Sequence, residues 1–397
     1  MTLDLVKVIE ALQQAVEEST TVARYREADL LALLEAFDDD EVLRRIEHAK
    51  TSWLLGVALE RYFRRFPAPT VPATGYSCIA TDGSIVASDR HGPLAYAVIN
   101  IGFCVLQYGQ TPEAQLGAEP TVLWREEDLW IVDGARRIPV SGTVLALRRA
   151  VMELEAGLGW IERVSRPVVV LLDGTLIPWG MEGQTTSVIQ WAMASFKPAL
   201  AAYREQRVPV AGVISYPGSR DIVNVLRVAA CDYPLQGRVV DCDDCLLRVQ
   251  RGEREQACLV VPNVTDRWLF GHCEIVRLAP GERTGCFRSR STILRQLPED
   301  DQIAFFYLHT GSEIARVELP LWVARDVSLL ELVHAVVWDQ CQRARGYPLA
   351  LQEAHEQAVV HSQERAQLET VLEELYAAQG LVMERSAKER SKRVRLA

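Results

Sequence analysis

The sequence contains few lysines and no long apolar run. Only five of its 43 basic residues are lysine, so arginine carries nearly all of the positive charge. No segment reaches the roughly 18 to 20 consecutive apolar residues that a membrane-spanning helix requires. The first residues also lack the basic flank and the cleavage site of a signal peptide. We therefore expect a cytoplasmic protein with no membrane association.

Cysteine is too scattered to indicate a disulfide framework. The nine cysteines are an odd number spread over 397 residues, which favours reduced thiols. Cys242 and Cys245, in "CDDC", have the spacing of zinc ligands. Further potential ligands are near them in sequence: Cys231, Cys258, His272 and Cys273. No second closely spaced pair completes a set of four ligands, so the sequence alone does not favour a structural zinc site.

The net charge of −10 argues against a protein that coats nucleic acid by neutralising many phosphates. It is compatible with a nuclease that has a local basic track. Arginine suits such a track because its planar guanidinium can bind a phosphate in two places. A bias in genome composition explains the arginine content at least as well.

Hydrophobic periodicity divides the chain into helical and extended parts. Apolar residues at spacings of three and four predict a helical segment over residues 1–66. The prolines of "PAPTVPATG" end this pattern and mark a domain boundary. Two strands follow, "YSCIATDG" and "LAYAVINIGFCVLQYG", joined by the polar turn "SDRHGP". "TVLWREEDLWIVDG" indicates further extended structure, and a helix then begins with Ser141 as its N-cap.

The second half of the chain alternates between helices and strands. We expect a helix in "TSVIQWAMASFKPALAAYREQ", a strand in "VPVAGVIS", a helix after "YPGSRD" and a hairpin in "DQIAFFYLHTGSEIARVELPLWVA". The residues after "SLLELVHAVVW" are again helical, and the basic tail "ERSAKERSKRVRLA" is expected to fray.

Two apolar runs each end on an Asp-Gly pair. The first contains Asp82 and Gly83, and the second, "VVVLLDG", contains Asp173 and Gly174. A carboxylate at the end of a buried strand is unfavourable unless hydrogen bonds, a cation or a metal compensates it. Two such aspartates, joined by an acid from the helix between them, would form an oxygen-rich pocket suited to Mg²⁺ or Mn²⁺. An isolated Asp-Gly pair is more often a simple turn, and that alternative stays open.

The order of acidic strand, hairpin strands, acidic helix and acidic strand resembles the ribonuclease H-like fold, an α/β fold in which helices flank a mixed β-sheet. Several segments more specifically resemble the NurA family of nucleases. They are "ATDGSIVASDRHGPLAYAVINIG", "VVVLLDGTL", "VAGVISYPGSRDIVNVLR", "FFYLHTGSEIARVELPLW" and "GYPLALQEAHEQAVV". The resemblance implies a nuclease domain over residues 70–365, preceded by the N-terminal helical segment 1–66 and followed by a C-terminal helix and basic tail, 366–397.

The resemblance also implies an activity and partners. It implies a Mn²⁺-dependent deoxyribonuclease, with Mg²⁺ as an alternative and two metal ions in each active site. Such an enzyme is a 5′–3′ exonuclease, with single-strand endonuclease activity as an additional option, and it processes DNA ends in double-strand break repair. The implied partners are DNA, a hexameric ATPase of the HerA type and a second copy of the chain in a homodimer.

Carried over onto this sequence, the resemblance makes Asp82 and Asp173 metal ligands. The helix between them offers Glu153 and Glu155, of which we favour Glu153 because it lies off the apolar stripe of that helix. A solvated helix face is the more common position for a glutamate, so the choice stays open.

Two further motifs supply candidate residues. Tyr347 and His355, in "GYPLALQEAHE", resemble the tyrosine and histidine near the family's active centre. His355 would bind the second metal ion or transfer a proton, and Tyr347 would orient phosphate or stack on a base. Ser219 and Arg220 precede a predicted helix, where backbone N–H groups can bind phosphate. An N-cap turn explains this last motif nearly as well.

The favoured hypothesis is two-metal hydrolysis of a phosphodiester. A catalytically inactive ribonuclease H-like scaffold, which binds DNA or the ATPase, is the alternative. A glycosidase that uses Asp82 and Asp173 as acid and base is disfavoured, because no aromatic-rich pattern for sugar binding accompanies them.

Overall fold

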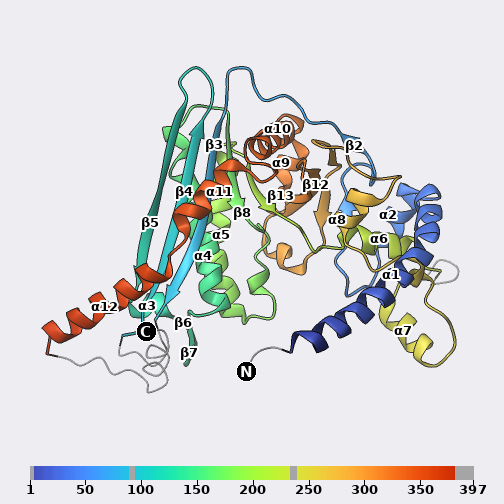
Figure 1. The fold of residues 1–397 in the computed structure, drawn as a ribbon, viewed down its shortest axis with the longest axis horizontal. Coiled ribbons are helices and arrows are strands. Elements are labelled where there is room, and N and C mark those ends of the chain that lie inside the picture. The colour runs from blue at the N-terminus through green and yellow to red at the C-terminus, as the bar shows by residue number, and fades with distance from the viewer. Residues whose placement is uncertain (1–3, 89–93, 233–238, 381–397) are drawn as a thin grey trace. The chain divides into compact units, whose positions relative to one another are not determined.

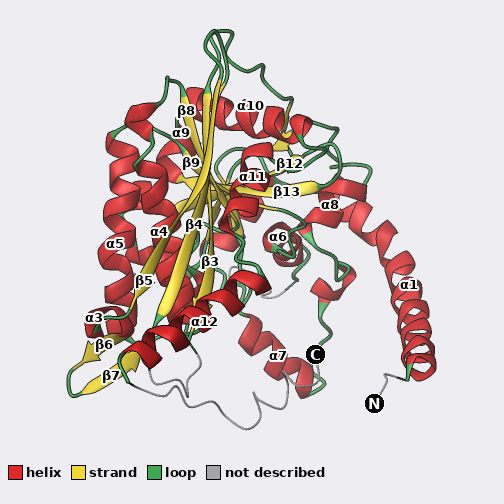
Figure 2. Ribbon diagram, turned by 60° about the vertical axis from the view of Figure 1, so that its left-hand side comes forward, coloured by secondary structure: helices red, strands yellow, loops and turns green. Residues whose placement is uncertain are grey.

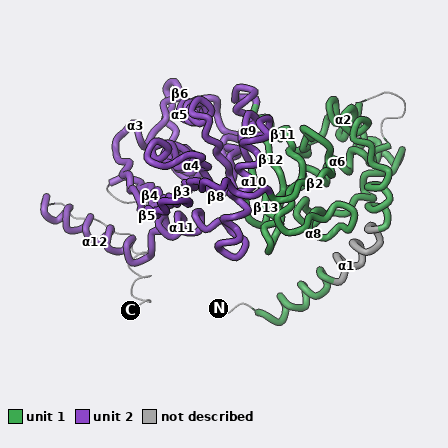
Figure 3. Tube along the Cα trace, turned by 90° about the horizontal axis from the view of Figure 1, so that it is seen from above, with its two compact units in different colours: residues 1–68, 214–294, 303–317 green, residues 69–213, 295–302, 318–397 purple. Residues whose placement is uncertain are grey.

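The computed structural model describes residues 4–88, 94–232 and 239–380. Most of the predicted turn "SDRHGP" and all of the basic tail lie outside these residues. The chain forms two compact units, coloured separately in Figure 3. Unit 1 consists of residues 1–68, 214–294 and 303–317, and unit 2 of residues 69–213, 295–302 and 318–397. The division into three segments made from the sequence stays a prediction.

Unit 2 contains an antiparallel meander followed by parallel strands (Figures 1 and 2). The meander is β3 (Ser77–Ala87), β4 (Ala97–Gln107) and β5 (Glu113–Leu123), and the parallel strands are β8 (Val168–Asp173) and β9 (Val210–Ile214). Their order across the sheet is β5-β4-β3-β8-β9. Parallel strands added beside the first strand of a three-stranded meander define the ribonuclease H-like arrangement. This confirms the predicted fold class and the pairing of the two predicted strands. The prediction that the first strand ends at Asp82 and Gly83 was wrong, because β3 pairs with β4 as far as Ala87.

Helices cover both faces of this part of the sheet. Helix α4 (Thr143–Leu158) packs on β3 and against α5 (Thr186–Glu205), with Leu147, Val151 and Leu154 on its buried side. Helix α11 (Leu349–Ala358) also packs on β3 and β4, and it contacts α10 (Val327–Arg343). Further elements of unit 2 are α3 (Glu126–Leu129), β6 (Trp130–Asp133), β7 (Arg136–Pro139), η1 (Ile161–Arg163), η2 (Trp179–Met181), η5 (Glu299–Asp301), α9 (Leu321–Arg325) and α12 (Ser362–Ala378).

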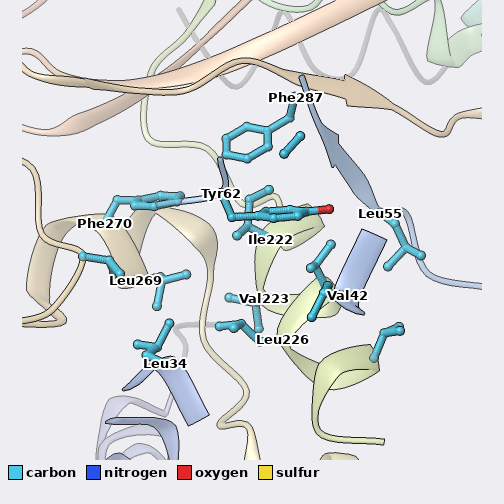
Figure 4. Close-up of a cluster of buried hydrophobic side chains, with 14 of the residues drawn as sticks. Leu34, Val42, Leu55, Tyr62, Ile222, Val223, Leu226, Leu269, Phe270 and Phe287 are labelled. Atoms are coloured by element: carbon cyan, nitrogen blue, oxygen red, sulfur yellow. The ribbon is translucent and has the colours of Figure 1, made fainter. Parts of the chain in front are cut away.

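Unit 1 surrounds a separate apolar core, shown in Figure 4. Tyr62, Phe270 and Phe287 are among its fully buried side chains. Its helices are α1 (Leu5–Glu35), α2 (Asp39–Glu47), α6 (Asp221–Ala229), α7 (Cys242–Gln250), η3 (Ala257–Val260) and α8 (Asp266–His272). Its strands are β1 (Gly56–Ala58), β2 (Arg65–Phe66), β10 (Arg283–Thr284), β11 (Phe287–Ser289) and β12 (Ile303–His309). Two elements begin in unit 1 and end in unit 2, η4 (Thr292–Gln296) and β13 (Ile314–Pro320). The predicted hairpin corresponds to β12 and β13, which are neighbours in the sheet.

Three local predictions were wrong. The helical pattern does not continue to residue 66, because β1 pairs with β11 and β2 pairs with β10, and these long-range pairings override the local periodicity. Ser141 is not the N-cap of α4; Gly142 takes that position with φ +54°, a conformation that glycine adopts readily. The segment after β5 is not continuously extended, because α3 interrupts it.

Candidate active site

Three predicted residues of unit 2 converge on one point. Asp82 lies within β3, Asp173 is the last residue of β8, and His355 lies on α11. One ligand atom from each lies within 4.8 Å of the other two. Among the described residues, no other group of three or more histidine, cysteine, aspartate or glutamate side chains meets this condition. We call these three residues the acidic cluster.

Strand register explains why the two aspartates meet. Strands β3 and β8 are parallel, and Thr81 is in register with Leu172. The next residue along each strand is an aspartate, so the two carboxylates follow neighbouring backbone positions. The two Asp-Gly pairs are therefore not independent turns, as the alternative interpretation required.

A close helix-to-sheet contact places His355 against Asp82. His355 Nδ1 lies 2.7 Å from Asp82 Oδ2. Gly102, on β4, is directly opposite Asp82. A Cβ at Gly102 would lie 2.3 Å from the Ala354 carbonyl oxygen and 2.4 Å from the Ala358 amide nitrogen, so only glycine allows α11 to approach this closely. No local signal in the sequence predicted this role of Gly102.

Tyr347 holds the second aspartate. Its hydroxyl donates to Asp173 Oδ1 at 2.7 Å. Burial raises the pKa of Asp173, while the hydrogen bond from Tyr347 acts in the opposite direction. The pKa of Tyr347 is itself raised, first by burial and then by the charge of Asp173, so this hydroxyl keeps its proton and remains a donor. Tyr347 and His355 of the "GYPLALQEAHE" motif thus each contact one of the two aspartates.

Glu153 lies beside the cluster without being within 4.8 Å of all its members. It is 5% exposed, whereas Glu155 faces solvent, so the structure brings Glu153 to the site. The pKa of Glu153 is raised to about 8; burial is the largest cause, Arg149 acts in the opposite direction, and the charges of Asp82 and Asp173 add to the increase. Its Oε1 atom is buried and has no hydrogen-bond partner.

The sequence analysis did not predict that Arg149 and Glu318 contribute to the site. The Arg149 guanidinium donates to the Gly83 carbonyl at 2.6 Å, and its Nε lies 3.3 Å from Glu153 Oε1. The position of Arg149 four residues before Glu153 on one helix was an available signal. Buried Glu318 accepts hydrogen bonds from the Thr175 hydroxyl and the Leu176 amide. Glu318 thereby fixes the loop that follows Asp173. The sequence did not indicate this role, because Glu318 lies far from Asp173 along the chain.

A cavity of about 330 Å³ adjoins these residues. Its lining includes Asp173, Glu153 and Arg149 together with apolar side chains such as Met181 and Phe196. Asp173 and Glu153 therefore border an open space rather than a fully packed core, whereas Asp82 and His355 are not part of its lining.

Ser219 and Arg220 belong to unit 1 and precede α6. The carboxylate of Asp266 accepts hydrogen bonds from the amides of Ile222 and Val223, so these two N–H groups of the helix start are already bonded within the chain. The Ser219 hydroxyl is bonded to the hydroxyl of Tyr307. Arg220 is exposed, and its side chain is the part of this motif that faces solvent. A role in binding nucleic acid stays a prediction.

The donor set fits a divalent cation. Carboxylate oxygens suit Mg²⁺ and Mn²⁺, and an imidazole shifts the preference toward Mn²⁺. The charges of Asp82 and Asp173 raise the pKa of Glu153 even though Arg149 is paired with it, so Arg149 does not offset all three carboxylates. Asp82, Asp173 and His355 would hold the cation, with Glu153 next to them.

Acidic residues on adjoining strands of a ribonuclease H-like sheet define a nuclease core. The NurA domain matches residues 76–360, which is most of the chain. The chain belongs to the NurA family of nucleases.

Two solved structures are distantly similar to the chain. The catalytic domain of human endonuclease V is 13% identical, with a TM-score of 0.30, over 84% of this chain and 95% of that one. An Argonaute from Marinitoga piezophila, in complex with guide RNA and target DNA, is 10% identical, with a TM-score of 0.24. That match covers 72% of this chain and 30% of the Argonaute chain, so this chain spans less than a third of that protein. No curated protein matches the chain. Within residues 4–88, 94–232 and 239–380, every helix is too short or too polar to cross a bilayer.

Proposed function

We propose that the chain is a Mn²⁺-dependent deoxyribonuclease that processes DNA ends by two-metal hydrolysis of the phosphodiester bond. The observation that carries the proposal is the convergence of Asp82, Asp173 and His355 within 4.8 Å on a ribonuclease H-like sheet. The membership of the NurA family supports a nuclease acting on DNA.

Divalent ions bound at this site would activate a water molecule and stabilise the leaving oxygen. Asp82 and Asp173 would hold these ions, and Tyr347 orients Asp173 through its hydrogen bond. The His355 side chain is 55% exposed. Because Nδ1 faces Asp82, Nε2 is the nitrogen that can reach a second ion or give a proton to the leaving oxygen. Arg149 keeps Glu153 beside the two aspartates.

The decisive experiment compares alanine variants on end-labelled single- and double-stranded DNA. We expect Asp82→Ala and Asp173→Ala each to lower Mn²⁺-dependent degradation by at least about 10³-fold, the scale of losing a principal electrostatic element of a site. Glu155→Ala is the matched control, because Glu155 is an exposed acid on the same helix as Glu153. Circular dichroism spectra would verify that the variants fold. Wild-type activity in both aspartate variants would reject the proposal.

The same assay addresses the finer parts of the proposal. Labels on the 5′ and 3′ ends distinguish 5′–3′ exonuclease activity from the reverse polarity, and a circular single strand reports endonuclease activity. Addition of a HerA-type ATPase tests the proposed partner, and light scattering tests the proposed homodimer. Tight Mn²⁺ binding with no DNA cleavage, with and without the ATPase, would instead support the inactive scaffold.

A further inference from the structure

The part of unit 1 that contains α7 and η3 buries very little apolar surface for its length. Of the residues in α7, only Cys245 is buried, and none of η3 is. Leu246, Leu247 and Leu259 are each about half exposed. Hydrophobic burial alone does not hold α7 and η3 in a single conformation, because so few of their side chains are buried. Small protein modules with too little core are commonly held together by a disulfide or a structural metal.

Four of the nine cysteines lie within α7 and η3 or shortly before them. Cys231 follows the end of α6, Cys242 and Cys245 lie three residues apart in the first turn of α7, and Cys258 lies in η3. Residues three apart on a helix share one face, so the two cysteines of "CDDC" can act together. In the structure the cysteines are thiols.

Backbone and ionic contacts hold these elements close to one another. Helix η3 packs against α6. The Arg45 guanidinium donates to the carbonyl of Cys231 at 3.1 Å, and the Cys242 amide donates to the carbonyl of Lys50 at 3.0 Å. An ion pair between Arg254 and Asp232 joins the residues just before η3 to the residue after Cys231.

The thiols influence one another's ionisation, as expected for neighbours. The pKa of Cys242 is raised to about 11, first by burial and then by Cys231, Cys258 and Cys245. The pKa of Cys258 is raised by burial and then by Cys231 and Cys245. Four thiolates at this point would repel one another unless a cation lay between them. No three of their sulfurs lie within 4.8 Å of one another, so a bound metal would draw them closer.

We propose that Cys231, Cys242, Cys245 and Cys258 form a structural zinc site that holds α6, α7 and η3 together. Four thiolates are the donor set that selects a tetrahedral soft metal, and zinc binding displaces the thiol protons. The spacing of two residues between Cys242 and Cys245 is that of a zinc knuckle, and Cys231 and Cys258 complete the set from either side. Cys273 is not a ligand in this proposal, because it packs in the apolar core of unit 1.

The test is the metal content of the full-length protein. Inductively coupled plasma mass spectrometry of protein expressed with added zinc and purified without chelator should find about one zinc per chain. The double variant Cys242→Ser/Cys245→Ser should lose it, whereas Cys286→Ser, at a buried cysteine of unit 1 outside the set, should retain it. The double variant Asp82→Asn/Asp173→Asn should also retain the zinc, which distinguishes this site from the acidic cluster and makes the result independent of nuclease activity.

A second measurement covers the case in which the cysteine variant does not fold. Titration of wild-type protein with an organomercurial should release zinc in step with thiol modification, followed with a chromogenic chelator. Wild-type protein without zinc would overturn the proposal, as would zinc that remains after Cys242 and Cys245 are replaced. Iron with acid-labile sulfide in place of zinc would also overturn it.

Discussion

Each unit contains a group of buried carboxylates, and the chain compensates the two groups differently. In unit 1 the Arg316 guanidinium donates to Asp221 at 3.0 Å, and both side chains are buried. Asp266 accepts hydrogen bonds from two amides of α6 and from the hydroxyl of Tyr307. In unit 2, Asp82 and Asp173 each contact one side chain of the "GYPLALQEAHE" motif, and the nearby Arg149 lies against Glu153.

The difference separates a structural role from a functional one. Unit 1 supplies a cation to Asp221 and hydrogen-bond donors to Asp266, so both carboxylates have partners within the folded chain. Unit 2 places Asp82 and Asp173 side by side, and these two aspartates contact His355 and Tyr347 rather than an arginine. Asp173 also borders the cavity. A buried acid is therefore informative about function only after its compensating groups have been identified.

The largest expected effect is on stability in unit 1. Arg316→Met leaves Asp221 as a buried carboxylate without its cation, and we expect it to lower the free energy of unfolding by about 3 to 5 kcal/mol. Asp82→Asn in unit 2, measured with chelator, should change it by less than about 1 kcal/mol, because that change also relieves repulsion between neighbouring acids. Urea denaturation would measure both.

The double variant Arg316→Met/Asp221→Leu is the control for this result. It removes the whole ion pair and should recover most of the lost stability. A loss for Asp82→Asn as large as that for Arg316→Met would show that the two groups do not differ as described.

The second prediction concerns metal binding. Free Mn²⁺ at a hundred times its dissociation constant should stabilise the folded protein by about 2.7 kcal/mol, which calorimetry would detect as a higher unfolding temperature. Asp82→Asn/Asp173→Asn should remove this stabilisation, whereas Asp221→Asn/Arg316→Met should keep it on a less stable background. Equal Mn²⁺ stabilisation in all variants would place the metal outside the acidic cluster.

The sequence predicted much of unit 2 because its signals are local. Apolar runs gave β3, β4 and β8, and the Asp-Gly pairs marked the two aspartates that the parallel register then joins. Unit 1 was harder, because β1 and β2 are short strands whose partners lie more than 200 residues away along the chain. Gly102 and Glu318 escaped notice for the same reason: each acts through a contact with a distant segment.

The third prediction is a pH dependence in unit 1. Burial, followed by the charge of Asp221, raises the pKa of Asp266 to about 7 from an ordinary value of 3.8. The folded state therefore holds this proton more tightly than the unfolded state. The stabilising contribution is fully present below about pH 4 and is lost as pH rises to about 7.

Asp266→Asn would isolate this contribution. An asparagine can still accept from the α6 amides, so the variant should be less stable than wild type at low pH and should approach or exceed it near neutrality. The measurement is the urea midpoint of both proteins from pH 4 to 8. A difference between the two midpoints that does not change with pH would contradict the raised pKa.

The smallest expected effects come from removing the tyrosine hydroxyl that donates to an aspartate in each group. Tyr347→Phe removes the hydrogen bond to Asp173 but leaves all carboxylates in place. It should weaken Mn²⁺ binding about tenfold, as the loss of a partner that orients a metal ligand typically does.

Tyr307→Phe is the matched variant in unit 1, because it removes the corresponding hydrogen bond to Asp266. It should lower stability by about 1 to 3 kcal/mol, the cost of an unsatisfied buried acceptor, without changing the Mn²⁺ affinity. Calorimetric titration with Mn²⁺ and urea denaturation of both variants would measure the two quantities. If Tyr307→Phe weakened Mn²⁺ binding as much as Tyr347→Phe, the hydrogen bond to Asp173 would have no special role at the metal site. The two tyrosines would then not differ in function between the two groups of carboxylates.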